Sequence, residues 1–129
     1  MDKSPHQLRN EILDYGLDEL SKDIVPIRDT IDVLSQKWKV EVLTSIVLGN
    51  KRFKEIRSLL PDVSDKVLSS RLATMVEEKL ILRKDMGDFA EYLPTEHGVK
   101  LYEVINRMRD WGKEHRRLCI GDFDLPGGK

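Results

Sequence analysis

The sequence predicts a mainly helical protein with one small β-hairpin, and three neighbouring stretches support this fold class. Residues 64–79 repeat apolar side chains at helical spacing, which indicates an amphipathic helix. A shorter helical pattern over residues 53–60 precedes it, and residues 61–62, a Pro-Asp pair, mark a tight turn between the two. Residues 80–93 then alternate as two strands around a turn at residues 87–88. Helix, turn, helix and hairpin in this order form a winged helix-turn-helix, whose second helix enters the major groove of DNA.

The helix over residues 64–79 has two different faces, with Ser64 as its expected N-cap. One face is apolar and must pack on a core: Leu68, Leu72, Met75, Val76 and Leu80. The opposite face is short, hydroxylated and almost uncharged, whereas a merely solvated face is usually rich in Glu–Lys pairs. Small polar groups allow close approach to DNA bases. The candidate base-reading residues are Lys66, Ser69, Ser70, Arg71 and Thr74. An intramolecular ion pair is the alternative role for Arg71.

Charge is unevenly distributed along the 129 residues, although the net charge is only −1. Residues 51–84 carry nine basic and five acidic side chains, and this is the one third of the chain with a net positive charge. Such an asymmetry is typical of a surface that binds phosphate, but an ordinary solvated domain can also have it. The candidate phosphate contacts are Arg52, Lys54, Arg57, Arg83 and Lys84.

The regions outside the helix-turn-helix predict further helices. Residues 5–15 suit a short amphipathic helix, and Pro26 is expected to begin another, with Ser35 as the cap of the helix after it. The apolar positions near the N-terminus lie on two faces, which is more than one small domain easily buries. They therefore require either a partner subunit or a groove within the chain. We therefore divide the chain into an N-terminal extension that contacts a partner (1–25), a winged helix-turn-helix domain (26–95), a dimerisation helix (96–118) and a flexible tail (119–129).

The last helix, which Thr95 is expected to cap, carries an apolar seam with the alternating three-and-four spacing of a heptad. Its members are Leu101, Val104, Met108, Trp111, His115 and Leu118. Over fewer than three heptads, this spacing fits either a dimer interface or packing on the helix's own domain.

Five pieces of the sequence, taken together and in order, resemble the HxlR family of bacterial winged-helix regulators. The pieces are Lys37-Trp38, residues 49–56, residues 60–72, residues 91–98 and Trp111-Gly112. The resemblance runs from about Pro26 to Arg117. It implies a dimeric, DNA-binding transcriptional regulator in which the last helix forms the dimer interface.

Three positions depart from the family's pattern. Many members have a Cys-Pro pair that serves redox or electrophile sensing, where this chain has Val25-Pro26 and therefore no nucleophile. The wing tip over residues 85–89 is shorter and acidic, and Ser35-Gln36 replaces a Gly-Gly pair. We expect that Cys119, the single cysteine, is not a sensor.

The sequence contains no metal motif, cofactor motif or catalytic constellation, so we do not expect the protein to be an enzyme or to need a cofactor. No stretch approaches the length of a membrane span and residues 1–15 lack the apolar core of a signal peptide, which favours a cytoplasmic protein. We expect a homodimer that binds double-stranded DNA at an inverted repeat, with an unidentified small-molecule effector left open. The alternative is a winged-helix module that binds proteins and has lost DNA binding.

Overall fold

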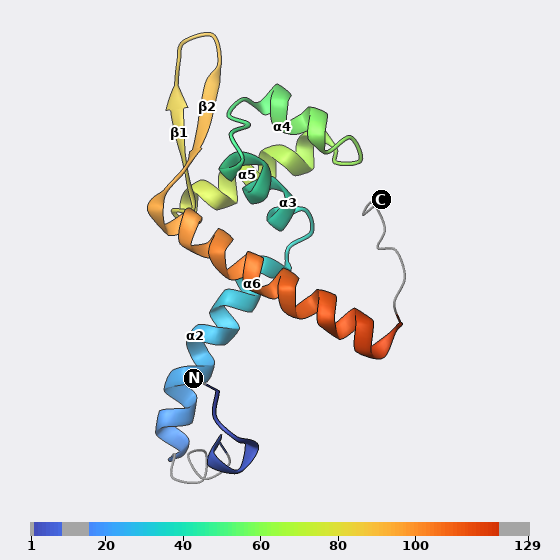
Figure 1. Ribbon diagram of the computed structural model, residues 1–129. Helices are drawn as coiled ribbons and strands as arrows, with labels where there is room; N and C mark the ends of the chain where they lie inside the picture. The colour runs from blue at the N-terminus through green and yellow to red at the C-terminus, as the bar shows by residue number, and fades with distance from the viewer. Residues whose placement is uncertain (1, 9–15, 122–129) are drawn as a thin grey trace. The chain divides into compact units, whose positions relative to one another are not determined.

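The computed structural model describes residues 2–8 and 16–121, and the chain divides into two compact units, residues 1–36 and 37–129 (Figure 1). The expected division after residue 25 therefore falls inside the first unit. Residues 5–8 are helical, but the rest of the helix expected up to Tyr15 lies outside the described residues. Most of the tail expected over residues 119–129 lies outside them as well.

The first unit is dominated by one long helix, α2 (Leu17–Ser35), in which no residue is buried. Pro26 lies inside this helix, so the prediction that a helix begins there is wrong. The proline removes one backbone donor without ending the helix, and Thr30 Oγ1 donates to the Pro26 carbonyl over 2.9 Å in the next turn. Because the helix is continuous, six of its apolar residues fall at alternating spacings of three and four: Leu17, Leu20, Ile24, Ile27, Ile31 and Leu34.

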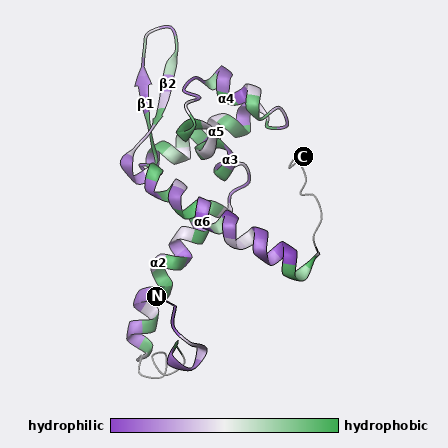
Figure 2. Cartoon of the chain, in the orientation of Figure 1, coloured by the Kyte–Doolittle hydropathy of each residue, from purple (hydrophilic) through white to green (hydrophobic). Residues whose placement is uncertain are grey.

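The second unit contains all the elements of the helix-turn-helix. They are α3 (Lys39–Val47), α4 (Phe53–Leu59), α5 (Asp65–Glu77), β1 (Ile81–Asp85), β2 (Ala90–Pro94) and α6 (Glu96–Cys119). Helix α3 is central, since it contacts α4, α5, α6 and β2. It is also largely hydrophobic, whereas α6 mixes hydrophilic and hydrophobic residues along its length (Figure 2). The buried apolar core consists of Val42, Leu43, Ile46, Ile56, Val63, Leu68, Leu72, Met75, Leu80 and Ile81.

An ion pair between a buried lysine and a half-buried glutamate joins the start of α3 to the end of α5. Lys39 is 3% exposed and its Nζ lies 2.5 Å from Glu78 Oε1, so the burial of its charge is compensated. The prediction that Ser35 caps this helix is wrong. Ser35 lies in the last turn of α2, where its hydroxyl donates to the Asp32 carbonyl, and α3 begins after Trp38, which has a left-handed backbone with φ of 75°.

Helix α5 ends in a tight C-terminal turn that directs the chain into β1. Lys79 has a positive φ of 62°, the Lys79 N–H donates to the Val76 carbonyl, and the Leu80 N–H donates to the Met75 carbonyl. This pair of bonds is the Schellman arrangement, and Met75 and Leu80, at the two positions that usually make its apolar contact, are both buried. The wing therefore leaves α5 at a fixed point.

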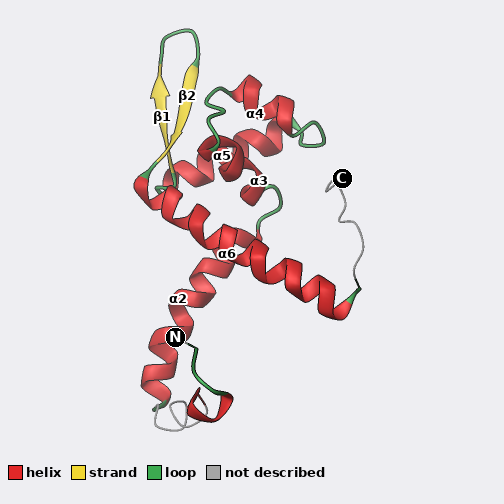
Figure 3. Cartoon of the chain, in the orientation of Figure 1, coloured by secondary structure: helices red, strands yellow, loops and turns green. Residues whose placement is uncertain are grey.

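The wing is the expected two-stranded hairpin, the one sheet in the described residues (Figure 3). Strands β1 and β2 are antiparallel, with Ile81 opposite Pro94 and Asp85 opposite Ala90. An isolated bridge joins Arg52 to Glu91, and the Tyr92 N–H donates to the Lys51 carbonyl over 2.7 Å.

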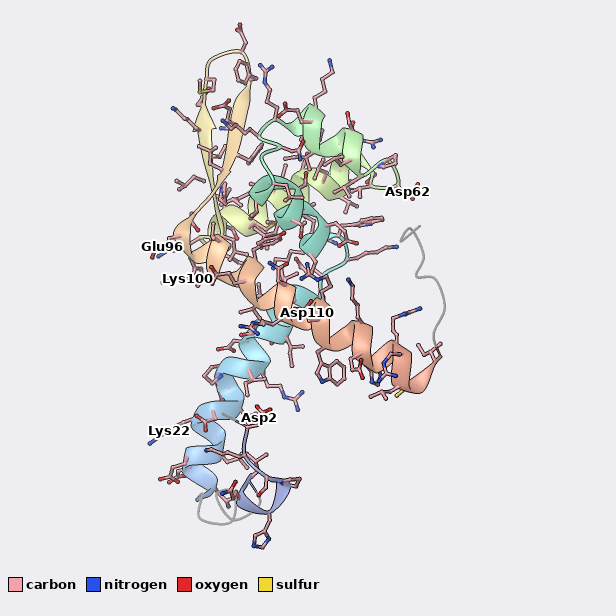
Figure 4. The ribbon with its side chains drawn as sticks, in the orientation of Figure 1. Asp2, Lys22, Asp62, Glu96, Lys100 and Asp110 are labelled. Carbon is pink, nitrogen blue, oxygen red and sulfur yellow. The ribbon has the colours of Figure 1, made fainter. Side chains whose placement is uncertain are left out.

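Helix α6 starts where the sequence places it. The Thr95 hydroxyl accepts the Gly98 N–H over 2.9 Å, and Lys100 Nζ lies 3.4 Å from Glu96 Oε1 in the first turns (Figure 4). Gly98 is packed against the Leu80 carbonyl, so closely that an added Cβ would lie 2.0 Å from that oxygen. None of the described helices is long and apolar enough to cross a membrane.

Candidate nucleic-acid interface

Helix α5 presents the two faces that the sequence predicts. Leu68, Leu72 and Met75 are buried, and the Ser64 hydroxyl accepts the Val67 N–H over 3.1 Å as the N-cap. The outward face begins in the first turn of the helix. Such a helix can lie in a groove of DNA without disturbing the core.

The candidate base-reading residues differ in their exposure. Lys66, Ser69 and Ser70 are exposed and Thr74 is half-buried. Lysine can donate to guanine O6 and N7, and serine hydroxyls can donate or accept at several base edges. The exposed part of this face therefore offers one cation and two hydroxyl groups within two turns of α5.

Arg71 has a different environment. It is half-buried, and its Nε donates to the Lys37 carbonyl over 2.7 Å. The bond connects α5 to the segment just before α3, where Trp38 has its left-handed backbone. The sequence also allowed an ion pair for Arg71, but in the structure its Nε donates to a backbone carbonyl. Only the outer guanidinium nitrogens of Arg71 remain for a base.

Arg57 is engaged across the helix-turn-helix. Its Nε donates to Asp65 Oδ1 over 2.7 Å, and its Nη1 donates to the Leu60 and Pro61 carbonyls over 3.3 and 3.2 Å. These bonds join the last turn of α4 to the first residue of α5. Three of the five guanidinium N–H groups are used in this way, so Arg57 stabilises the turn between the two helices.

Arg52 lies against the wing. Its Cζ is 3.4 Å from the centroid of the Phe89 ring, well inside the distance of about 6 Å at which cation–π attraction acts. Three residues along, Glu55 Oε1 accepts the Arg52 and Lys51 N–H groups over 2.9 Å each. These two bonds, that of Arg52 first, lower the pKa of the Glu55 carboxyl.

The remaining candidate phosphate contacts, Lys54, Arg83 and Lys84, are exposed. Lys54 and Arg83 line a groove of about 780 Å³ between α4 and the wing. Its other walls are formed by Arg52, Phe53, Glu55, Ser58, Phe89, Ala90 and Tyr92. The wing tip is acidic, and Asp85 Oδ1 accepts the Gly87 N–H over 3.0 Å within the turn.

Sequence reasoning missed Phe89 and Glu55 as partners of this surface. Glu55 could have been found, because it lies three residues after the residue that precedes α4, where a carboxylate typically accepts backbone N–H groups. Phe89 could not, because no local pattern relates a hairpin residue to an arginine 37 positions earlier.

The predicted dimer seam of α6 is mostly exposed. Val104, Met108, Trp111 and Leu118 are 44%, 52%, 69% and 68% exposed, whereas Leu101 is half-buried. The His115 ring is also exposed and stacks on Trp111 with a centroid distance of 4.8 Å. Cys119 Sγ lies 3.6 Å from His115 Nδ1. No three His, Cys, Asp or Glu side chains in the described part of the chain are placed to bind a metal ion.

A helix-turn-helix followed by a two-stranded wing, with the second helix exposed, defines a winged helix-turn-helix protein. The family model for the HxlR-like helix-turn-helix matches residues 33–118. The chain therefore belongs to this family.

The relatives agree with this assignment. The HTH-type transcriptional regulator YdeP of Bacillus subtilis strain 168, itself uncharacterised, is 34% identical over 114 residues, which cover 84% of this chain and 88% of YdeP. The reduced form of the regulator YodB from B. subtilis has a TM-score of 0.67 at 25% identity, covering 76% of this chain and 96% of YodB. The redox regulator HypR in its reduced form has a TM-score of 0.66 at 27% identity, covering 75% of this chain and 99% of HypR. The chain is a transcriptional regulator and not an enzyme.

Proposed function

We propose that the chain is a homodimeric regulator that binds a specific inverted repeat in double-stranded DNA. The observation that carries this proposal is the exposed face of α5, where Lys66, Ser69 and Ser70 lie opposite the buried Leu68 and Leu72. These side chains would read base edges, with Thr74 and the outer nitrogens of Arg71 at the margin. A regulator that acts on DNA in this way would work in the cytoplasm.

The phosphate contacts in this proposal come from the exposed cations beside α5. Lys54 lies on α4, and Arg83 and Lys84 lie on β1, so the three would contact the DNA backbone on either side of the reading helix. Phosphate contacts hold the register of the protein on DNA but carry no sequence information. Specificity would therefore depend on α5, and the salt dependence of binding on these cations.

Two seams of exposed apolar residues support the dimer. Helix α6 exposes Met108, Trp111 and Leu118, which is costly for an isolated chain in water. Helix α2 independently carries six apolar residues at heptad spacing, five of them at least 39% exposed. A second copy of the chain would cover both seams, because apolar seams with heptad spacing pack against other helices. In a two-fold dimer, the two α5 helices would enter successive major grooves about 34 to 36 Å apart.

A protein-binding module without DNA binding is the second candidate. Two acidic features favour this candidate, Asp65 at the start of α5 and the wing tip, but Asp65 forms an ion pair with Arg57 and so has a compensated charge. The acidic tip, with Asp85 and Asp88, remains its main support.

A binding titration separates the two candidates. Fluorescence polarisation should be measured with fragmented genomic DNA at low salt, followed by selection of the fragments bound at higher salt. We expect micromolar or tighter binding to bulk DNA, and selected fragments that share an inverted repeat. Absence of binding at low salt would favour the protein-binding module.

The effector remains a separate question. YodB has also been solved with a quinone bound, and HypR is described as a redox regulator. In this chain Val25 stands at the position of the family's sensing cysteine, and Cys119 near the end of α6 is exposed. We infer that a small molecule, if one acts, binds without using Cys119.

A further inference from the structure

The wing needs support from outside itself, because a two-stranded hairpin is marginally stable in water on its own. Only Ile81, at the inner end of β1, is fully buried, and every residue from Leu82 to Phe89 is exposed. At the base, the Tyr92 N–H donates to the Lys51 carbonyl and Arg52 pairs with Glu91. These contacts lie in β2 and leave the tip unsupported.

The Arg52 side chain supplies a contact nearer the tip. Its guanidinium lies over the Phe89 ring, with Cζ 3.4 Å from the ring centroid. Phe89 is the last residue of the tip turn, and its carbonyl accepts the Met86 N–H over 2.9 Å. Holding Phe89 therefore holds the turn that carries the acidic tip.

The position of Arg52 is itself fixed from the helix side. Glu55, in the first turn of α4, accepts both the Lys51 and the Arg52 N–H groups. The guanidinium thus reaches the ring from a backbone that is tied to the helix-turn-helix. Arg52, Glu55 and Phe89 form a connection between α4 and the wing, which we call the wing clamp.

We propose that Arg52 is a positioning residue, which fixes the wing to the helix-turn-helix through Phe89 instead of contacting DNA phosphate. Lys54 and Arg83, which line the same groove, would make the phosphate contacts there. The DNA half of this proposal rests on the proposed function. The clamp itself does not, because it is a property of the free protein.

The first test needs no DNA. Amide hydrogen exchange should be compared among the wild type, Arg52→Gln, Phe89→Leu, Arg52→Lys and the control Lys54→Gln. We expect exchange over residues 85–90 to accelerate in Arg52→Gln and Phe89→Leu and to stay unchanged in Lys54→Gln, with α3 and α5 unaffected in all. Arg52→Lys should also accelerate exchange, because lysine keeps the charge but lacks the planar group that stacks on the ring.

The second test measures how the binding constant for DNA depends on salt. Loss of one phosphate contact lowers the log–log slope by about 0.9. We expect Lys54→Gln to show that loss, and Arg52→Gln to weaken operator binding with the slope unchanged. The double variant Arg52→Gln/Phe89→Leu should bind no more weakly than Arg52→Gln alone, since both substitutions break the same contact.

Two results would overturn the proposal independently. If hydrogen exchange in the wing is the same in Arg52→Gln as in the wild type, Arg52 does not hold the wing. A slope lowered by about 0.9 in Arg52→Gln would show that Arg52 contacts phosphate, whatever the exchange data. If the wild type binds no DNA, the proposed function fails, and so does the assignment of phosphate contacts to Lys54 and Arg83. Hydrogen exchange in the free protein still tests whether Arg52 holds the wing.

Discussion

Arg57 and Asp65 are joined by a hydrogen bond of 2.7 Å between Nε and Oδ1, which crosses the turn between α4 and α5. The same guanidinium also donates to the Leu60 and Pro61 carbonyls. The turn into α5 is therefore stabilised by one side chain, for which the sequence predicted a phosphate contact.

Replacing that side chain should destabilise the fold and not merely remove a charge. We expect Arg57→Gln to lower the free energy of unfolding by about 1 to 2 kcal/mol, because three bonds to one charged group are lost and partial exposure weakens each. Asp65→Asn, which keeps an acceptor oxygen, should lose less than half as much. Urea unfolding measures both, and equal losses in the two variants would contradict this role for Arg57.

Glu55 predicts a pH dependence. Its folded-state pKa is lowered, chiefly by the N–H groups of Arg52 and Lys51, so the stabilisation by its charge is complete above the unfolded pKa. The stabilisation is lost as the pH falls through the lower folded value. Glu55→Gln keeps an acceptor but no charge, so the wild type should be the more stable protein at pH 7. That difference should shrink towards pH 3, and a difference that is the same at both pH values would refute the assignment.

Gly98 predicts a steric requirement at the start of α6. An added Cβ would lie 2.0 Å from the Leu80 carbonyl oxygen, which already accepts the Thr95 N–H and so cannot move freely. We expect Gly98→Ala to destabilise the fold by about 1 to 3 kcal/mol. Alanine at His97, the exposed residue before it, should change stability by less than about 0.5 kcal/mol. If the thermal unfolding midpoint of Gly98→Ala equals that of the wild type, α6 can shift away from Leu80 to make room for the added methyl group.

Trp111 predicts the assembly state. It is 69% exposed on α6, so in the proposed dimer it would be buried by the second copy. Light scattering should give twice the chain mass of 15.0 kDa for the wild type and one chain mass for Trp111→Glu, because a buried unpaired charge is strongly unfavourable. Lys113→Glu, on another face of α6, should remain dimeric. A measured mass of 15.0 kDa for the wild type at micromolar concentration would contradict the proposed dimer, and with it the proposed binding to an inverted repeat.

The elements that follow local rules could be predicted from the sequence. Helices α4, α5 and α6 and both wing strands lie where periodicity and turn residues place them, and Ser64 and Thr95 cap the helices expected of them. Pro26 misled the prediction because proline is favoured in a first helical turn, and dividing α2 there concealed the heptad pattern that crosses it.

The roles of the arginines could not be predicted, because their partners are set by tertiary contacts. Arg71 binds a carbonyl 34 residues away, and Arg52 contacts a ring across the wing. In the amino-acid composition, each of these side chains is only one positive charge. In the folded chain each of these arginines has a partner distant in the sequence, a carbonyl for Arg71 and an aromatic ring for Arg52.

If α5 reads DNA bases, Lys66→Gln should change the sequence preference of binding. Binding should be measured at fixed salt on the selected operator and on random DNA of the same length, with Lys54→Gln as the matched control. We expect Lys66→Gln to cost about 1 to 3 kcal/mol of binding free energy on the operator and less on random DNA, so that specificity relaxes at particular positions. Lys54→Gln should weaken both DNAs alike. Equal losses on operator and random DNA for Lys66→Gln would contradict the claim that α5 carries the specificity.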